Sequence, residues 1–153
     1  MAHPIVAGVD TTADSLAALK TAADLAQQSD TWLLAVHVRH EMASAEVGVV
    51  AGRDAVALRV ALDEMEAITR AQATAAMAGR PVHWRLDVVA GDPATELLRE
   101  AVDNDAATIV VGGRHHGVVG GLVLGSVAQK LVRKSPISVF VVRDGEAHRV
   151  NAA

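Results

Sequence analysis

The sequence contains no cysteine, which excludes disulfide bonds and thiolate metal sites. Aromatic side chains are scarce, with two Trp, one Phe and no Tyr among 153 residues, so a base-stacking platform for nucleic acid is hard to build. The formal net charge of −4 does not favour binding to a nucleic-acid backbone, which calls for a basic stripe. These features argue against a nucleic-acid partner.

Long apolar runs are also absent. No stretch of 18 or more apolar residues occurs, so no membrane span and no membrane partner are predicted. Residues 1–4 have neither a basic segment nor an apolar leader, and they do not predict a secretory signal. Apolar residues make up 51% of the chain and charged ones 21%, which is typical of a globular protein. We therefore expect a cytoplasmic protein that forms one domain over residues 1–153, with a loose tail at 144–153.

Five short apolar runs predict β-strands, and a helical pattern follows each of the first four. The runs cover residues 5–9, 32–38, 82–89, 108–111 and 137–142. Thr12 and Asp92 are candidate helix caps, and Pro93 suits a first helical position. Strands that alternate with helices predict an α/β fold in three α/β/α layers, with a parallel sheet between the helices. Ligands of such sheets bind beyond the carboxyl ends of the strands, where the strand order reverses.

Three local patterns predict how individual elements pack. A long helix before Gly79 carries an apolar stripe that we expect to lie in the core. The stripe contains Leu58, Ala61, Leu62, Met65 and Ile68, and the charged residues Arg59, Asp63, Glu66 and Arg70 fall on the other side. The spacing of Ser126 and Gln129 matches a capping box at the start of the last helix. The strand at 82–89 alternates polar and apolar residues, which indicates an edge position or one wetter face.

Glycine is concentrated in one loop, with six of the twelve glycines between Gly112 and Gly125. Glycine allows the backbone to approach a ligand closely, and the free N–H groups of a helix that opens at Ser126 favour an anion such as phosphate. The alternative is that the glycines only form a tight strand-to-helix connection. A P-loop is not matched, because the lysine before the hydroxyl residue is lacking, and the usual dinucleotide fingerprint is absent. The strand, the glycine loop and the helix start together indicate phosphate binding.

A combination of short motifs along the chain resembles the universal stress protein family. The motifs are Val6–Asp10 with Ser15, Gly91–Ala94, Val110–Arg114, Leu124–Val127 and Pro136–Val139. The resemblance covers roughly residues 4–143 and implies an adenine nucleotide alpha hydrolase-like fold, with a five-stranded parallel sheet in the order 3-2-1-4-5. The family commonly forms homodimers. We expect a homodimer through the strand at 137–142, because so apolar a strand at a sheet edge is a liability when uncovered.

One branch of the family binds ATP through a glycine, two residues, a glycine, nine residues, a glycine and then serine or threonine. Another branch lacks this motif and does not retain ATP. Gly112, Gly125 and Ser126 match the motif, but His115 stands where the second glycine belongs. The resemblance places a nucleotide beside Gly8, Val9, Asp10, Val38, Val111, Gly112, His115, Gly125, Ser126, Val127 and Ala128. Asp10 is also a candidate independently of the resemblance, because a carboxylate at a strand end can accept a hydrogen bond from a ribose hydroxyl. The alternative is that Asp10 only caps a local turn.

Histidine at position 115 leaves two outcomes open. Its imidazole either swings outward and meets phosphate, or it fills the pocket and the site stays empty. We expect the first outcome, because the other matching residues are retained. It predicts weak ATP binding, on the order of tens of micromolar, that strengthens as the pH falls toward roughly 6.

The expected function is a universal stress protein that binds an adenine nucleotide, with ATP and Mg as the ligands, in a stress-response or regulatory role. No dedicated catalysis is expected, because no general base, lysine clamp or magnesium carboxylate pair accompanies the phosphate loop. One alternative is a dimeric interaction module of the same fold that binds no nucleotide, and a second is a slow ATPase or self-phosphorylating protein. His115 and His116 are adjacent and rarely suit one ion, so no metal site is expected. His37 and His40 are expected to be a packed and a solvated residue rather than a catalytic pair.

Overall fold

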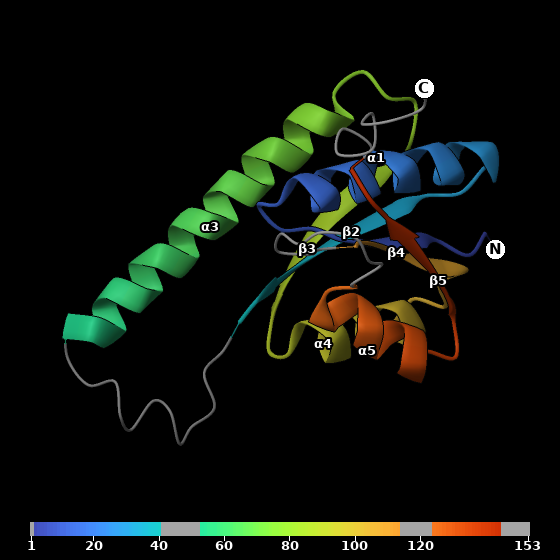
Figure 1. Cartoon of the computed structure of the whole chain (residues 1–153). Helices are drawn as coiled ribbons and strands as arrows, with labels where there is room; N and C mark the ends of the chain where they lie inside the picture. The colour runs from blue at the N-terminus through green and yellow to red at the C-terminus, as the bar shows by residue number, and fades with distance from the viewer. Residues whose placement is uncertain (1, 41–52, 114–123, 145–153) are drawn as a thin grey trace, which may run out of the picture.

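The computed structural model describes residues 2–40, 53–113 and 124–144. In these ranges five strands alternate with four helices along the chain (Figure 1). The strands are β1 (Ile5–Gly8), β2 (Leu33–Arg39), β3 (Trp84–Ala90), β4 (Thr108–Gly112) and β5 (Ser138–Val142). The helices are α1 (Ala13–Gln28), α3 (Arg53–Met77), α4 (Pro93–Asp103) and α5 (Ser126–Lys134). Each predicted apolar run therefore forms a strand, with its bounds shifted by no more than two residues.

All four strand pairings are parallel, and the strand order is β3-β2-β1-β4-β5, which confirms the predicted sheet. β1 lies at the centre, where Ile5 is aligned with Leu33 of β2 on one side and with Thr108 of β4 on the other. β3 occupies an edge of the sheet, which is one of the two positions that its alternating pattern indicated. The chain leaves β1 toward β2 and later returns to β4 on the opposite side. The strand order therefore reverses beside β1, where ligands of such sheets bind.

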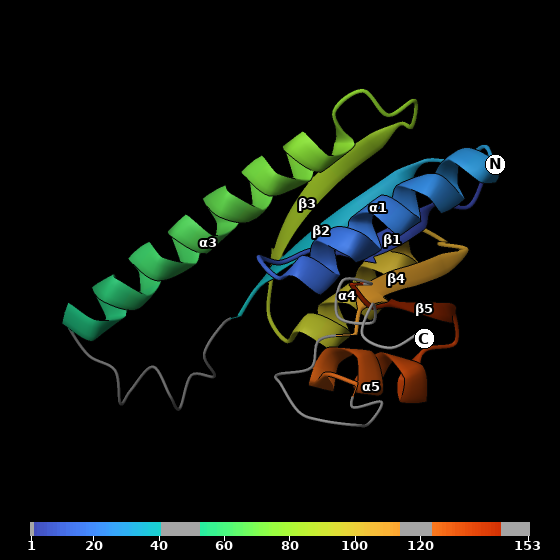
Figure 2. The same cartoon turned by 45° about the horizontal axis from the view of Figure 1, so that its top comes forward.

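Helices cover both faces of the sheet (Figures 1 and 2). α1 and the second half of α3 pack on one face, and α4 and α5 pack on the other. Side chains of β2 alternate between the two cores, because Leu33 and Ala35 join the first and Leu34 and Val36 the second. An interior strand is thus buried on both faces, which explains why it is a continuous apolar run in the sequence.

The predicted packing of α3 is wrong. Leu58, Met65 and Ile68 of the apolar stripe are 37%, 42% and 49% exposed. The buried residues of this helix are Thr69, Ala73 and Met77. The physical reason is the position of the helix, whose first half extends past the end of the sheet while its second half lies over the sheet (Figures 1 and 2). Ala73 and Met77 of this second half then join the core that α1 and the sheet form.

The start of α5 also differs from the prediction. Its N-cap is Gly125 rather than Ser126, and within residues 124–144 and the other described ranges no side chain caps its first turn. The Gln129 Nε2 donates instead to the carbonyl oxygen of Leu124 at 2.7 Å. The capping box is therefore wrong, because Gly125 keeps an extended backbone and Ser126 is already the first helical residue.

The predictions about a membrane span, about His115 and His116 and about the tail can be compared only with the described ranges. None of the helices in these ranges combines the length and the apolar character that crossing a bilayer requires. His115, His116 and most of the tail, residues 145–153, lie outside the described residues. The predictions made for them stay predictions.

Candidate functional site

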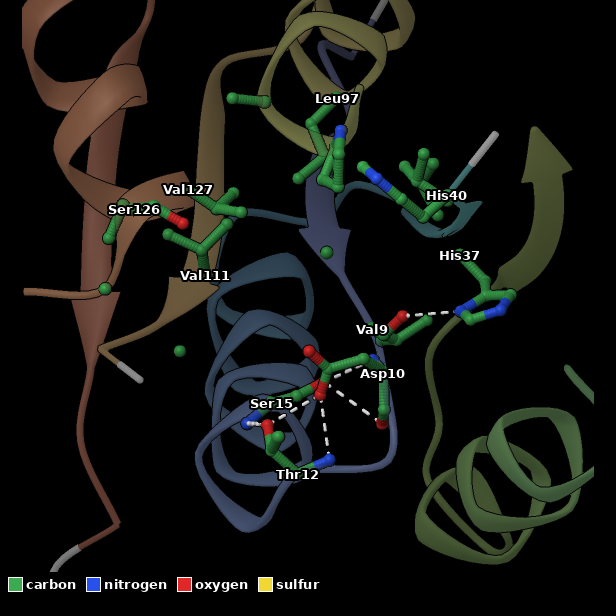
Figure 3. Close-up of a pocket in the computed structure, with 18 of the residues that line it drawn as sticks. Val9, Asp10, Thr12, Ser15, His37, His40, Leu97, Val111, Ser126 and Val127 are labelled. Carbon is green, nitrogen blue, oxygen red and sulfur yellow. Dashed lines mark hydrogen bonds between the residues drawn. The ribbon is translucent and has the colours of Figure 1, made fainter. Parts of the chain in front are cut away.

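A cavity of about 430 Å³ lies beyond the carboxyl ends of β1, β2 and β4, between α1, α4 and α5 (Figure 3). This volume is within the range of small-molecule sites. The cavity is lined by ten of the eleven residues that the sequence assigned to a nucleotide site, and His115 lies outside the described residues. The ten are Gly8, Val9, Asp10, Val38, Val111, Gly112, Gly125, Ser126, Val127 and Ala128. The structure thus brings together residues from three strands and a helix start that are far apart in the sequence.

The turn after β1 holds Asp10 at the edge of this cavity (Figure 3). The Asp10 Oδ1 accepts hydrogen bonds from the backbone N–H of Thr12 at 2.8 Å and from its hydroxyl at 2.6 Å. The Asp10 N–H donates to the Ser15 Oγ at 2.7 Å, and Thr12 caps α1 by accepting from the Ser15 N–H. The turn-cap alternative therefore accounts for the contacts of Asp10 Oδ1. The same contacts fix the direction of the carboxylate at the cavity edge.

Gly112 and Gly8 line the cavity, and both have packing reasons to be glycine. A Cβ at Gly112 would lie 2.7 Å from the carbonyl carbon of Asp14 and 2.8 Å from the Ser15 nitrogen. Both are backbone atoms of the first turn of α1, so they cannot move aside cheaply. A Cβ at Gly8 would meet the Leu97 Cδ1 at 2.9 Å, which is the far end of a side chain. Gly112 is thus required for α1 to approach β4, whether or not a ligand binds.

The N-termini of α4 and α5 line the same cavity but differ in how their N–H groups are satisfied. At α4, Asp92 is the N-cap, and its Oδ2 accepts from the backbone N–H of Thr95 at 3.0 Å. At α5, Gly125 is the N-cap, with φ −62° and ψ 163°, and no side chain of the described residues accepts from the first turn. The first N–H groups of a helix have no partner within it, and the helix dipole makes that end attractive to anions. The start of α5 therefore differs from that of α4 in having no acceptor from a described side chain.

A cross-helix ion pair lies at the edge of the cavity. The Lys130 Nζ donates to the Asp92 Oδ2 at 2.7 Å and to the Thr95 Oγ1 at 3.3 Å. The Lys130 ammonium, followed by the hydrogen bonds from Thr95, lowers the pKa of Asp92 to about 2. Asp92 is thus an anion under all ordinary conditions, and it joins the starts of α4 and α5 through one lysine.

The end of β2 and the middle of α3 close another side of the cavity. His37 is buried, and its Nδ1 lies 3.0 Å from the carbonyl oxygen of Val9, so this nitrogen carries a proton and donates (Figure 3). His40 is exposed, so the expectation of one packed and one solvated histidine matches the structure. Arg39 forms ion pairs at 2.8 Å with both Asp63 and Glu66 of α3. Both carboxylates were expected to face away from the core, and they instead tie α3 to the sheet.

Sequence reasoning missed several residues that line the cavity. They are Thr12, Ser15, Val36, His37, Arg39, His40, Leu62, Met65, Asp92, Pro93, Ala94, Leu97 and Lys130. A signal was present for the α4 group, because Asp92 and Pro93 start a helix after a strand, as Gly125 and Ser126 do. No local signal identified Leu62 and Met65, because their position depends on how far α3 extends past the sheet. Among the described residues, no group of three or more His, Asp or Glu side chains is arranged to hold a metal ion.

Comparisons with known proteins agree with this arrangement. The sequence model of the universal stress protein family matches residues 1–143. A universal stress protein of Thermus aquaticus is 40% identical over 87 residues, which is 57% of this chain and 61% of that protein. The structure of a universal stress protein from Archaeoglobus fulgidus in complex with dAMP is similar with a TM-score of 0.65 at 20% identity, over 93% of this chain and 99% of that chain. A universal stress protein in complex with cAMP is similar with a TM-score of 0.61 at 26% identity, over 92% of this chain and 96% of that chain.

The family match covers all five strands and four helices of the described ranges, including every described residue that lines the cavity. The strand order expected for the family is the one observed. The chain belongs to the universal stress protein family.

Proposed function

We propose that this universal stress protein binds an adenine nucleotide in the cavity, with phosphate at the start of α5. The observation that carries the proposal is the difference among three helix starts that line the cavity. Thr12 caps α1 and Asp92 caps α4, whereas no side chain in the described part of the chain caps α5. The N–H groups that α5 leaves without a side-chain acceptor are the natural site for a phosphate oxygen.

The rest of the cavity suits the other parts of a nucleotide. Apolar side chains offer a surface for a flat base, and they come from the turn after β1 and from β2, α4, β4 and α5 (Figure 3). They are Val9, Val38, Leu97, Val111 and Val127. The carboxylate of Asp10 lies between this surface and α1, where it is placed to accept a hydrogen bond from a ribose hydroxyl. The apolar surface, the Asp10 carboxylate and the N–H groups of α5 together suit an adenine nucleotide. ATP is the expected ligand, with Mg as its counterion.

Relatives support the ligand class, because solved family members are in complex with dAMP and with cAMP. We propose a stress-response or regulatory role for the bound nucleotide rather than turnover. Asp10 is engaged by Thr12, and Asp92 by Lys130 and Thr95, so both carboxylates of the described lining already have hydrogen-bond donors. A general base works best with a pKa near the operating pH, and the pKa of Asp92 is only about 2.

The first test is binding itself. Protein purified without added nucleotide is denatured, and released ligands are identified by mass spectrometry, followed by calorimetry with ATP and with GTP. We expect ATP to bind with a dissociation constant on the order of tens of micromolar. Val38→Trp should remove binding because it fills the base side of the cavity, whereas Val132→Trp, on the exposed side of α5, should not. His115→Gly restores the motif and should not weaken binding; failure of both this variant and the wild type at millimolar ATP leaves the interaction module as the function.

A homodimer through β5 is a second part of the proposal. β5 is the last strand of the sheet and pairs with β4 alone among the described strands. Phe140, at its middle, is 49% exposed, while Val139 and Val141 pack against the α4 and α5 side. A second β5 would cover this apolar edge. Light scattering is expected to give twice the mass of one chain for the wild type and the mass of one chain for Phe140→Lys.

A further inference from the structure

Lys130 occupies a position that the nucleotide motif does not include. It lies one turn after Ser126 on α5, and long side chains on a helix point back toward its N-terminus. The ammonium therefore reaches toward the first turn of α5, and Lys130 lines the cavity together with that turn. Lys130 is thus a cation beside the N–H groups that would receive phosphate.

The present partner of Lys130 can release it without being left unsatisfied. The Asp92 Oδ2 also accepts from the Thr95 N–H at 3.0 Å and from the Thr95 hydroxyl at 2.7 Å, so the α4 cap does not depend on lysine. The ion pair is open to solvent, with side-chain exposures of 37% for Lys130 and 51% for Asp92. Exposed ion pairs of this kind stabilise a protein only weakly. The free-energy cost for Lys130 to leave Asp92 and pair with a phosphate is therefore small.

Arg39 provides the contrast. Lys130 and Arg39 are the lysine and arginine side chains that line the cavity among the described residues. Arg39 is held by two carboxylates, Asp63 and Glu66, and both come from the helix that it anchors. The planar guanidinium suits such a fixed double contact, whereas an ammonium on a flexible stem can turn between partners. Lys130 is the cation that is able to change partner.

We propose that Lys130 is a phosphate-specificity residue. Its ammonium breaks the ion pair with Asp92 and contacts the phosphates of a nucleotide bound at the start of α5. The inference rests on the proposed function and names its ligand class, because it requires a nucleotide with a phosphate chain rather than a nucleoside. Asp92 opposes binding in this scheme by competing for the lysine and by repelling the phosphate. Lys130 and Asp92 together set how strongly the cavity prefers charged ligands over neutral ones.

The experiment compares ATP with adenosine by calorimetry, using the full chain and five variants. Lys130→Met is expected to weaken ATP binding about tenfold and to leave adenosine binding unchanged. Lys134→Met removes the same charge from the same helix outside the cavity lining, and it should change neither ligand by more than about twofold. Lys130→Arg should restore most of the ATP affinity.

Asp92→Asn tests the exchange directly, because asparagine keeps the α4 cap but loses the charge. ATP affinity should rise by about threefold, and this gain should be smaller when Asp92→Asn is combined with Lys130→Met, because only the relief of phosphate repulsion then remains. Equal weakening by Lys130→Met and Lys134→Met, or equal loss for ATP and adenosine, would overturn the inference and leave nucleotide binding in place. Absence of ATP binding by the wild type at millimolar concentration would overturn the proposed function and the inference together.

Discussion

The starts of α4 and α5 are the same kind of structure in the same cavity, and they differ in what completes them. α4 begins with Asp92 and Pro93, and its own carboxylate accepts from the first turn. α5 begins with Gly125 and Ser126, and none of the side chains that the structure describes does so. In a fold with several helix starts at one edge of a sheet, the ligand position is indicated by the start that the chain does not cap itself. α4, which its own Asp92 caps, gives the matched comparison within the same cavity.

Closing α5 in the manner of α4 should produce the largest change. In Gly125→Asp, the new carboxylate is expected to accept from the first turn of α5 and to repel phosphate. Nucleotide binding should weaken on the order of a hundredfold, or about 3 kcal/mol, while the helix is not destabilised. Gly125→Ala separates bulk from charge and should weaken binding less, because φ −62° is open to any residue and a methyl group neither accepts a hydrogen bond nor repels phosphate. Calorimetry and thermal unfolding measure both; unchanged binding in Gly125→Asp would show that phosphate lies elsewhere.

Gly112→Ala should act on the fold, and it separates the packing role of a motif glycine from a ligand role. The added Cβ meets backbone atoms of Asp14 and Ser15, so we expect the free energy of unfolding to fall by about 2 kcal/mol without ligand. Gly8→Ala meets the end of the Leu97 side chain and should cost less. Urea unfolding of both variants gives the comparison. Equal stability of Gly112→Ala and the wild type would contradict the packing account.

Opening α4 should have a smaller effect than either change. Asp92→Ala removes the N-cap and also the acceptor for Lys130, so the free energy of unfolding should fall by about 1 kcal/mol. Asp92→Asn keeps an acceptor for the Thr95 N–H and should lose only a few tenths of a kcal/mol. Urea unfolding near neutral pH distinguishes them. If Asn is as destabilising as Ala, the ion pair rather than the cap stabilises this helix start.

Features fixed by neighbouring residues could be predicted from the sequence. The caps at Thr12 and at Asp92 with Pro93 were recognised because each depends on two or three consecutive residues. The order of elements and the parallel sheet followed from apolar runs and helical patterns, and the strand order came from the family resemblance. The residues around the cavity followed from the same resemblance and from strand ends meeting at one edge.

Features fixed by distant contacts could not be predicted. The apolar stripe of α3 suggested burial, but burial depends on whether a sheet lies beneath it, and the first half of the helix extends past the sheet (Figure 2). The pair of Lys130 with Asp92 joins residues 38 positions apart, and neither position carries a local mark of the other. The sequence does contain the capping-box pattern at Ser126, but Gly125 has the extended backbone of an N-cap, so the helix is capped one residue earlier.

The smallest expected effect concerns the charge of Asp92, and it needs no ligand. The pKa of Asp92 is lowered from 3.8 to about 2, first by Lys130 and then by Thr95. A carboxyl whose pKa is lower in the folded state binds fewer protons there than in the unfolded chain. Its contribution to stability is therefore complete above about pH 4 and is lost as the pH falls through about 2. The pair between α4 and α5 should thus persist throughout the mildly acidic range.

Lys130→Met tests whether Lys130 or Thr95 is the main cause of the lowered pKa of Asp92. Because the lysine is the largest cause of the shift, its removal should raise the pKa of Asp92 toward 3.8, while Thr95 keeps it somewhat below that value. Carboxyl carbon chemical shifts followed by NMR between about pH 1.5 and 6 would give the midpoint in the wild type, in Lys130→Met and in Lys134→Met. Lys134 lies on the same helix but is not a cause of the shift, so its removal should leave the midpoint near 2. A midpoint that stays near 2 in Lys130→Met would mean that the cap at α4 is sufficient by itself and that Lys130 is already available to a ligand.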